Sequence, residues 1–221
     1  MSTGKPNGSP AEKRLRIDPG SPDPAVIRRA ASILRQGGVV IFPTSFLYGL
    51  GADATRPEAV SRIFSIKRRR PTNPVSILIN QKQDLAGLVT EVPEAANRIM
   101  EQLWPGKITL VFPASARLPA NLTANTGKIG IRLPLHPGAK MLVAEASIPI
   151  TATSVNLSGE PACSRIEEIP QSILDAVDLI LDAGPLPGGT GSTVVDVTVS
   201  PPRILRDGAV SAETVLAAAI G

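Results

Sequence analysis

Short apolar runs alternate with longer amphipathic segments along this chain. The run from Val39 to Phe42 has four consecutive apolar residues and stops at Pro43-Thr44, which is typical of a buried strand that ends at the edge of a sheet. Comparable runs predict further strands at residues 74–79, 108–112, 129–134, 149–154, 177–181, 193–199 and 203–206.

Helices are expected between these strands. An apolar stripe after Asp23 predicts a first helix that begins at Pro24 and ends before Gly37. Thr55 and Glu58 have the spacing of a capping box and predict the start of a second helix. Further helical segments are expected at 84–89, 93–103, 138–146, 160–175 and 211–220. The alternation predicts an α/β fold with one twisted, mostly mixed open sheet flanked by helices.

The first residues of the chain differ in composition from the rest. Residues 1–21 are rich in Pro, Gly, Ser, Lys and Arg and contain little apolar surface to offset the entropy of ordering, so we expect a disordered polar tail. The basic cluster from Lys13 to Arg16 either is solvated, which the composition favours, or contacts nucleic acid. No linker is visible after residue 24, and residues 22–221 are expected to form a single domain.

Composition excludes several classes of site. Aromatic residues make up 3% of the chain, which argues against a surface that stacks the bases of single-stranded nucleic acid. Cys163 is the one cysteine, so an internal disulfide and a cysteine-based zinc cluster are excluded. His136 is the one histidine, so a Ser-His-Asp triad would have to use it. The net charge of +4 permits binding of nucleotides or RNA without requiring it.

No membrane or export signal is visible in the sequence. It contains no apolar run of about 18 residues, which a membrane-spanning helix would need. Its N-terminal segment is polar and lacks the apolar region of a secretory signal. We therefore expect a cytoplasmic protein without a membrane span.

Small polar residues or cations occur where several predicted strands end. Ligands of open α/β sheets bind beyond the carboxyl ends of the strands, so these side chains could meet in one crevice. Arginines in such a crevice would suit a polyphosphate or a carboxylate. The residues are Thr44, Ser45, Lys67, Arg69, Arg132, Thr153, Ser154, Asn156, Ser192, Thr193 and Arg206. The P-loop pattern, a Gly-x-Gly-x-x-Gly after the first strand and the Gly-x-Ser-x-Gly elbow are absent from the sequence.

Seven short motifs carry a resemblance to a known family. In chain order they are Pro43-Thr44-Ser45-Phe46-Leu47-Tyr48-Gly49-Leu50, Lys67-Arg68-Arg69-Arg70 with Asn73-Pro74-Val75, Trp104-Pro105-Gly106-Lys107-Ile108-Thr109, Arg132-Leu133-Pro134 followed by His136, Ser154-Val155-Asn156-Leu157-Ser158-Gly159, Ser192-Thr193-Val194-Val195-Asp196, and Leu205-Arg206-Asp207-Gly208. From about residue 25 to 210 the chain resembles the YrdC-like family of threonylcarbamoyl-adenylate synthases. It departs from the family pattern at Phe46, Arg68, Arg70 and Val155.

The resemblance implies a YrdC-like catalytic domain at 22–221 and a nucleotidyltransferase reaction. In this family L-threonine, bicarbonate and ATP give threonylcarbamoyl-AMP and pyrophosphate, and Mg²⁺ is held mainly by the ATP phosphates, with no metal ligand in the protein. The product serves the t6A modification of adenosine 37 in tRNA. Downstream tRNA threonylcarbamoyl transferase proteins would be partners, and the chain could also contact tRNA or double-stranded RNA.

The resemblance also implies roles for individual residues. Lys67 and Arg69 would be the catalytic residues, because they hold the phosphates. The implied ATP-binding residues are Lys67, Arg69, Thr151, Ser154, Asn156 and Arg206. The implied L-threonine-binding residues are Thr44, Ser76, Arg132, Ala152 and Ser192, with Arg132 as the partner of the carboxylate. Thr109 and His136 remain open between a functional and a structural role.

Two other functions remain open at this point. The chain could be a non-catalytic paralogue that binds double-stranded RNA or tRNA by shape, through the basic run at 67–70 with Arg132 and Arg206. Arg68 and Arg70, which replace Gly and Pro of the family pattern, favour this alternative. The other is a carbamoyl-transfer domain like that of a hydrogenase-maturation carbamoyltransferase, which would bring cysteine motifs that this sequence lacks. The sequence does not determine the oligomeric state.

Overall fold

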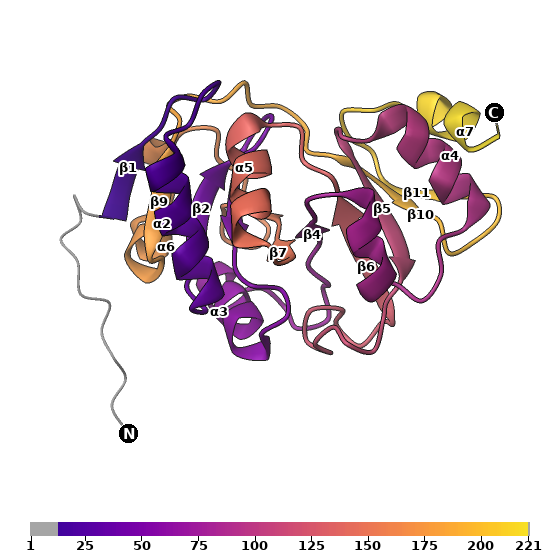
Figure 1. Ribbon diagram of the computed structural model, residues 1–221, viewed down its shortest axis with the longest axis horizontal. Coiled ribbons are helices and arrows are strands. Elements are labelled where there is room, and N and C mark those ends of the chain that lie inside the picture. The colour runs from indigo at the N-terminus through magenta and orange to yellow at the C-terminus, as the bar shows by residue number, and fades with distance from the viewer. Residues whose placement is uncertain (1–12, 221) are drawn as a thin grey trace.

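The computed structural model describes residues 13–220, and its strands form two mixed sheets side by side (Figure 1). The strand orders are β1-β9-β2-β3-β8 and β11-β10-β5-β6-β4-β7. The strands are β1 (Arg14–Arg16), β2 (Val40–Pro43), β3 (Tyr48–Gly51), β4 (Ile77–Leu78), β5 (Ile108–Pro113), β6 (Lys128–Arg132), β7 (Ile150–Thr151), β8 (Thr153–Ser154), β9 (Leu179–Asp182), β10 (Thr193–Asp196) and β11 (Arg203–Arg206). The α/β class with mixed sheets is confirmed, but the strands form two sheets where one was expected.

Helices flank both sheets. They are α2 (Pro24–Arg35), α3 (Pro57–Lys67), α4 (Glu94–Leu103), α5 (Pro137–Ala146), α6 (Gln171–Ala176) and α7 (Ala212–Ile220), with 3-10 helices η1 (Lys82–Gly87) and η2 (Ile166–Glu168). None of the described helices is long and apolar enough to cross a membrane.

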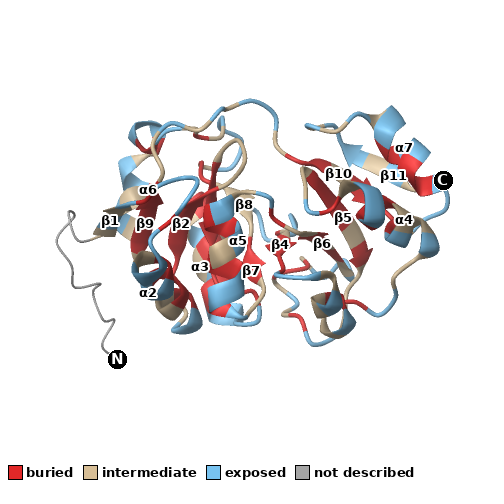
Figure 2. Ribbon diagram, turned by 45° about the horizontal axis from the view of Figure 1, so that its top comes forward, coloured by how far each residue is buried: buried red, intermediate tan, exposed pale blue. Residues whose placement is uncertain are grey.

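Both faces of the first sheet are buried. Val40 and Phe42 of β2 pack in a core with α2 and α5, whereas Ile41 packs in the opposite core with α3 and α6. Figure 2 shows these strands as buried between helices whose outer faces are exposed. Burial on both sides explains why β2 is a continuous apolar run in the sequence.

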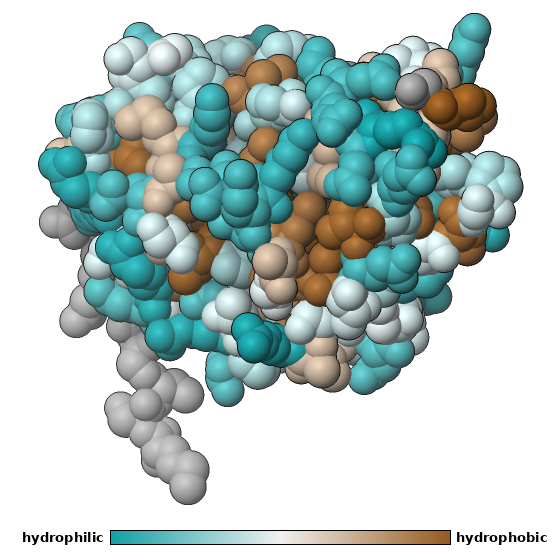
Figure 3. Space-filling view, turned by 45° about the vertical axis from the view of Figure 1, so that its right-hand side comes forward, coloured by the Kyte–Doolittle hydropathy of each residue, from teal (hydrophilic) through white to brown (hydrophobic). Residues whose placement is uncertain are grey.

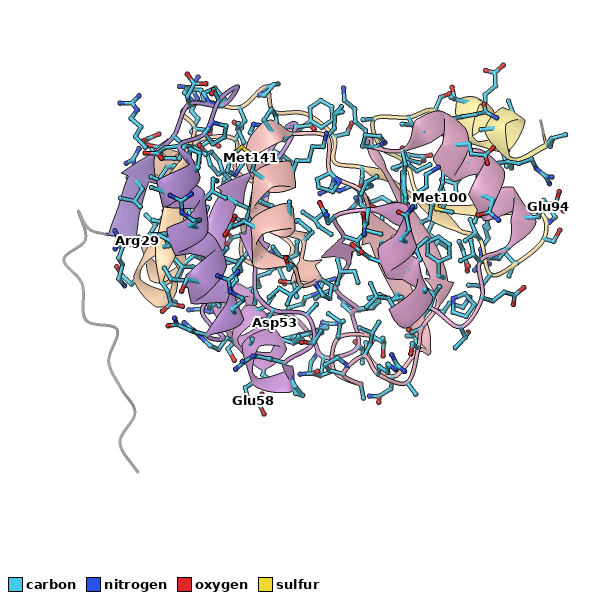
Figure 4. All side chains as sticks on the ribbon, viewed as in Figure 1. Arg29, Asp53, Glu58, Glu94, Met100 and Met141 are labelled. Carbon is cyan, nitrogen blue, oxygen red and sulfur yellow. The ribbon has the colours of Figure 1, made fainter. Side chains whose placement is uncertain are left out.

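The second sheet packs one face against α4 and α7. Leu110 of β5 and Ile131 of β6 lie in this core together with Met100 of α4, which is labelled in Figure 4. Because side chains alternate along a strand, Thr109 and Arg132 point to the opposite face. That face forms a wall of the cleft described below.

The segment 149–154, predicted as one strand, changes sheets at Ala152. β7 pairs with β4 in the second sheet, and β8 pairs with β3 in the first. Between them, Ala152 N donates a hydrogen bond to Ser76 O over 2.7 Å. The backbone therefore joins the two sheets at this residue.

The start of the first helix is confirmed, and that of the second is corrected. Asp23 accepts a hydrogen bond at the N-terminus of α2 (2.8 Å), and Pro24 is its first residue. The predicted capping box at Thr55 is wrong, because Thr55 Oγ1 donates to Asp53 Oδ1 (2.6 Å) and lies outside α3. Arg56 precedes α3 without a side-chain cap.

The predicted disordered tail at 1–21 is wrong for its later part. β1 pairs in parallel with β9. Arg14 Nη2 lies 2.8 Å from Asp182 Oδ2 and 2.7 Å from Glu167 Oε1. This basic cluster therefore bonds within the fold, where strand pairing offsets the entropy of ordering. Residues 1–12 lie outside the described part of the chain.

β3 contains Gly49 and Gly51, in a stretch for which the sequence predicted no strand. A Cβ atom at Gly51 would come within 2.8 Å of the Phe42 ring on the neighbouring strand. These glycines therefore let a large side chain of β2 pack across β3.

Candidate active site

A cleft of about 330 Å³ lies where the two sheets meet. Its lining comes from the loop between β2 and β3, the segment before β4, strands β5 and β6, the junction of β7 with β8, and the loop before β10. Most of the residues assigned from the sequence line it, namely Thr44, Arg69, Ser76, Arg132, Ala152, Ser154, Ser192 and Arg206. The remaining three, Lys67, Thr151 and Asn156, are buried and do not line the cleft.

Arg132 is a cation without an anionic partner among residues 13–220. It ends β6, and its guanidinium makes no hydrogen bond or ion pair with any residue that the structure describes. Burial, together with the positive charge of Arg206, lowers the pKa of Arg132 to about 10, so the side chain remains protonated at neutral pH. A guanidinium in this state is suited to a carboxylate, which it can bind through two parallel hydrogen bonds.

Two hydroxyl groups lie in the same cleft. Ser76 has no side-chain hydrogen bond to a described residue, and the absence of a Cβ at Gly130 makes room for it, since a Cβ there would lie 2.7 Å from Ser76 Oγ. Thr44 Oγ1 donates to Leu47 O over 2.6 Å and closes the loop between β2 and β3. Ser76 is therefore free to bind a ligand, whereas Thr44 also shapes the loop.

Ser192 and Arg206 form a bonded wall of the cleft. Arg206 Nη2 donates to Ser192 O over 2.7 Å, and the Ser192 hydroxyl lies 2.8 Å from Thr109 Oγ1. Gly208 is needed for this packing, because a Cβ there would lie 2.4 Å from Thr193 N. Hydrogen bonds to both the backbone and the side chain of Ser192 therefore hold this wall in place.

Lys67 is directed inward from the end of α3. The side chain is almost fully buried, and its ammonium donates to Ser154 O, to Asn156 O (2.9 Å) and to Asn156 Oδ1 (2.9 Å). Burial, and then the charge of Arg69, lower the pKa of Lys67 to about 8. All three hydrogen bonds of the ammonium therefore go to the segment at 154–156, and the expected contact of Lys67 with phosphates stays a prediction.

The other two buried residues are also bonded within the protein. Asn156 Oδ1 accepts from Ser154 Oγ (2.6 Å), and its Nδ2 donates to Glu160 O. Thr151 Oγ1 accepts from Ala52 N over 2.9 Å. Their side chains therefore bond within the segments that form the cleft wall, and their expected roles in ATP binding stay predictions.

The charge of the cleft favours anions. Arg69, Arg132 and Arg206 line it, and no carboxylate of a described residue does. Burial lowers the pKa of Arg69, whose Nη2 donates to Pro74 O over 2.8 Å. Within residues 13–220 there is no cluster of three or more His, Cys, Asp or Glu that could hold a metal ion. The described side chains can therefore hold phosphates or carboxylates directly.

The same basic residues do not make one exposed surface. Lys67 is buried, and Arg132 is half-buried in the cleft. Arg206 lines the cleft and is exposed, and Arg68 and Arg70 are exposed on the run after α3. On the face that Figure 3 shows, hydrophilic side chains surround small hydrophobic patches. This arrangement favours a small anionic ligand over a broad RNA surface.

Sequence reasoning missed part of the lining. Thr109 was left open, and Gly189 and Gly191 were given no role, yet all three line the cleft. The Gly/Pro-rich stretch at 184–191 was the available signal, because glycines often mark a close approach of backbone to a ligand.

Comparison with known proteins identifies relatives that match most of this chain. The Sua5/YciO/YrdC family model, described as "Telomere recombination", matches residues 32–208. A threonylcarbamoyl-AMP synthase of Pyrococcus abyssi is 38% identical over 86% of this chain and 56% of its own length. A putative threonylcarbamoyl-AMP synthase of Mycobacterium tuberculosis is 37% identical over 84% of this chain and 85% of its own length.

A solved structure shows the same fold. Pyrococcus abyssi Sua5 complexed with L-threonine has a TM-score of 0.89 to this chain at 35% identity, and the match covers 93% of this chain and 60% of that one. The chain therefore spans little more than half of this relative. Because the family model and the relatives match most of its sequence, this chain belongs to the Sua5/YciO/YrdC family.

Proposed function

We propose that this chain is an L-threonylcarbamoyladenylate synthase, which makes threonylcarbamoyl-AMP and pyrophosphate from L-threonine, bicarbonate and ATP. The observation that carries the proposal is the Arg132 guanidinium, which has no partner within residues 13–220 and lies in a cleft that also contains Arg69 and Arg206 and no described carboxylate. An amino-acid carboxylate and a triphosphate are two anions that such a cleft can bring together. The names of the relatives, and the L-threonine in the solved Sua5 structure, support the same substrates.

The amino acid is assigned to one end of the cleft. Arg132 binds the carboxylate of L-threonine, and the hydroxyl of Ser76 and the backbone at Ala152 lie on the same lining. Thr44 and Ser192 complete this end. The set supplies one fixed charge and several hydrogen-bonding groups for a small zwitterion.

ATP is assigned to the other end. Arg69, Ser154 and Arg206 face its phosphates and nucleoside. Lys67 acts from behind the wall, where it fixes Ser154 and Asn156 and contributes positive charge. Thr151 supports the same wall, since its side chain is buried against the backbone of the first sheet.

The reaction needs positioning and charge neutralisation more than a strong base. The amine of threonine and bicarbonate combine to a carbamate with loss of water. A carbamate oxygen then attacks the α-phosphorus of ATP, and the bond to pyrophosphate breaks. Fixed guanidinium groups stabilise the negative charge that develops. Mg²⁺ bound to the ATP phosphates would neutralise further charge, and no described carboxylate in the lining competes with it.

The product would enter tRNA modification. A mixed anhydride of a carbamate with AMP is an activated acyl donor, so an enzyme that transfers the threonylcarbamoyl group to adenosine 37 of tRNA must consume it. The chain would therefore work in the cytoplasm with downstream tRNA threonylcarbamoyl transferase proteins.

Pyrophosphate release from ATP tests the proposal. The wild-type protein should release pyrophosphate only when L-threonine and bicarbonate are both present, and Arg206→Ala should reduce the rate about tenfold or more. Arg203→Ala on the same strand is the control, because Arg203 is exposed and lies outside the cleft lining. Threonine-independent release, or RNA binding with a steep salt dependence and no response to threonine, would contradict the proposal.

A further inference from the structure

The loop at residues 183–192 crosses from the first sheet to the second. It follows β9 and precedes β10, and Figure 1 shows it as the orange segment that spans the two halves of the molecule. Its last part lines the cleft through Gly189, Gly191 and Ser192. A segment without helix or strand therefore makes one wall of the cleft, and the position of that wall depends on the contacts that fix the loop.

Glycines shape the part of the loop that reaches the cleft. Gly188 and Gly189 have φ angles of +74° and +95°, which residues with a Cβ rarely adopt. Gly189 and Thr190 are exposed, and neither makes a hydrogen bond to a residue within 13–220. Because such a backbone is costly to order, the conformation of the loop has to be fixed by bonds at its other residues.

Tyr48 bonds to the first residues of this loop. Its hydroxyl donates to Gly184 O over 2.7 Å and accepts from Ala183 N over 3.0 Å. The side chain is fully buried, and burial raises the pKa of the hydroxyl to about 12, so it remains a neutral donor at neutral pH. One buried hydroxyl thus pairs with both a donor and an acceptor of the loop backbone.

Asp182 orders the same turn from the end of β9. Its Oδ1 accepts from Gly184 N over 2.8 Å and lies 3.4 Å from the Tyr48 hydroxyl. Its Oδ2 lies 2.8 Å from Arg14 Nη2 of β1. The ion pair therefore holds the buried carboxylate in place beside the hydroxyl.

Tyr48 is the most firmly held of the groups that bond to the loop from outside it. Its strand β3 lies between β2 and β8 and pairs with both. The other contacts come from Ser164 O, which accepts from Leu186 N, and from Phe46 O, which accepts from Gly188 N, each over 2.9 Å. Ser164 and Phe46 lie outside the helices and strands, so the hydroxyl of Tyr48 links the loop to the sheet itself.

We propose that the Tyr48 hydroxyl positions the loop at 183–192, and with it the cleft wall that ends at Ser192, for binding of the amino-acid substrate. Tyr48 is a positioning residue, because its hydroxyl is bonded within the protein and acts through the loop. The inference rests on the proposed function, which assigns L-threonine to the end of the cleft that Ser192 completes. Without the hydroxyl, the loop would be ordered only when the ligand binds, and the lost entropy would lower the affinity.

Tyr48→Phe tests this role, since it removes the hydroxyl and keeps the ring in the core. The variant should bind L-threonine about fivefold more weakly in calorimetry, as expected for the loss of one hydrogen bond within the protein. Its KM for L-threonine should rise by a similar factor while kcat changes less than twofold, because a loosened wall weakens the ground state and the transition state alike.

Thr198→Val is the matched control. It removes a hydrogen bond of 2.6 Å from the Thr198 hydroxyl to the buried Asp196, at a position outside the cleft lining. This variant should lose a comparable amount of stability and keep the L-threonine affinity of the wild type. The comparison separates an effect on the loop from an effect of lower stability.

Hydrogen exchange measures the loop directly. In Tyr48→Phe the amides within 183–188 should exchange at least threefold faster than in the wild type, because Ala183 N loses its acceptor. The amides of β2, β3 and β9 should keep their wild-type rates. Saturating L-threonine should slow the loop amides of the variant, because the ligand orders the loop when it binds.

Three results would overturn the proposal. They are an unchanged L-threonine affinity in Tyr48→Phe, a fall in kcat at constant KM, and faster exchange throughout β2, β3 and β9, which would show that the hydroxyl supports the core as a whole. Pyrophosphate release by the wild type tests the synthase proposal separately. If the wild type releases none, while Tyr48→Phe still loosens the loop and weakens L-threonine binding, the proposed function fails and the positioning role stands.

Discussion

The guanidinium of Arg132 is half-buried, charged and unpaired among the described residues. Such a group costs free energy until an anion completes its hydrogen bonds. Arg206 adds to this cost, because its positive charge contributes to the lowered pKa of Arg132. A bound carboxylate offsets both effects, so amino-acid binding should depend strongly on this residue.

Replacing Arg132 should therefore weaken the binding of L-threonine and of ATP to different extents. Arg132→Ala should weaken L-threonine binding about 10- to 100-fold, the range for loss of a charge-assisted bidentate hydrogen bond, and weaken ATP binding far less. Calorimetry with each substrate measures both effects, and Arg117→Ala, at an exposed position outside the cleft, is the control. Equal weakening of both substrates would contradict the assignment.

The lowered pKa of Lys67 predicts that ATP affinity depends on pH. Its pKa is about 8 because of burial and the charge of Arg69, so the ammonium is charged below pH 8 and loses its charge as the pH rises above it. A positive charge favours ATP, whose phosphates are already ionised near pH 7.5. ATP affinity should therefore fall about threefold between pH 7 and pH 9.5.

A titration of ATP affinity against pH checks this expectation. Lys67→Met should remove the midpoint near pH 8, and Lys140→Met, at an exposed position of α5, should retain it. A flat profile in the wild-type protein would show that the buried ammonium does not contribute to ATP binding.

At the scale of elements, the site depends on the alternation of β5 and β6. Each strand places apolar residues toward α4 and α7 and turns the intervening ones toward the cleft. Gly130 is one of these intervening residues, and it leaves the space that the hydroxyl of Ser76 occupies. β6 therefore shapes the amino-acid end of the cleft in two ways: Arg132 supplies a charge, and Gly130, which has no side chain, leaves room for Ser76.

Filling the space beside Gly130 should lower substrate affinity more than it lowers the stability of the fold. In Gly130→Ala the new Cβ would lie 2.7 Å from Ser76 Oγ and must displace it, so L-threonine affinity should fall about tenfold. Gly87→Ala is the control, because a Cβ at Gly87 meets no atom within 4 Å. Unchanged threonine affinity in Gly130→Ala would remove Ser76 from the binding site.

These elements also show what the sequence could predict. The apolar run of β2, the start of α2 at Pro24 and the polar strand ends were readable because they are local patterns. The division into two sheets was not, because it depends on pairings such as that of β10 with β5, which lie far apart in the chain. The change of sheet at Ala152 leaves strands of two residues on either side, which are too short for a periodic pattern.

Lys67 shows a signal that was available and missed. Ala59 and Ile63 lie on the buried face of α3, and Lys67 follows at the same four-residue spacing. The helical period thus places its side chain on the apolar face, directed into the protein. Lys67 and Arg69 were selected from the motif match alone, without use of this spacing, which also distinguishes the buried Lys67 from the exposed Arg68 and Arg70.

At the scale of the whole molecule, the cleft exists because two separately packed sheets meet at the segment 150–154. The first sheet is extended at its edge by β1, where Arg14 bonds to Asp182 and Glu167. Tyr48 of the cleft lining also reaches this region, since its hydroxyl donates to Gly184 O over 2.7 Å.

Removing this ion pair should lower stability in a pH-dependent way. Arg14→Ala should lower Tm by about 1–3 °C at pH 7, because Arg14 is partly exposed and only Asp182 is buried. Hydrogen bonds outweigh burial and lower the pKa of Asp182, so the stabilisation is present above its unfolded value and is lost as the pH falls through the folded one.

Thermal unfolding at pH 7 and pH 3 measures this difference. The gap between wild type and Arg14→Ala should narrow at pH 3, while Arg117→Ala should melt with the wild type at both values. A gap that stays constant down to pH 3 would show that Arg14 stabilises the edge by packing and not by charge.

The central claim is that one cleft joins L-threonine, bicarbonate and ATP. Incubation of the protein with ATP, L-threonine and ¹³C-bicarbonate, followed by mass spectrometry, tests it most directly. The account predicts a threonylcarbamoyl-AMP product that carries one ¹³C atom, appears together with pyrophosphate and is lost in Arg132→Ala. An adenylate without the label, or no adenylate from folded wild-type protein that binds both substrates, would contradict it.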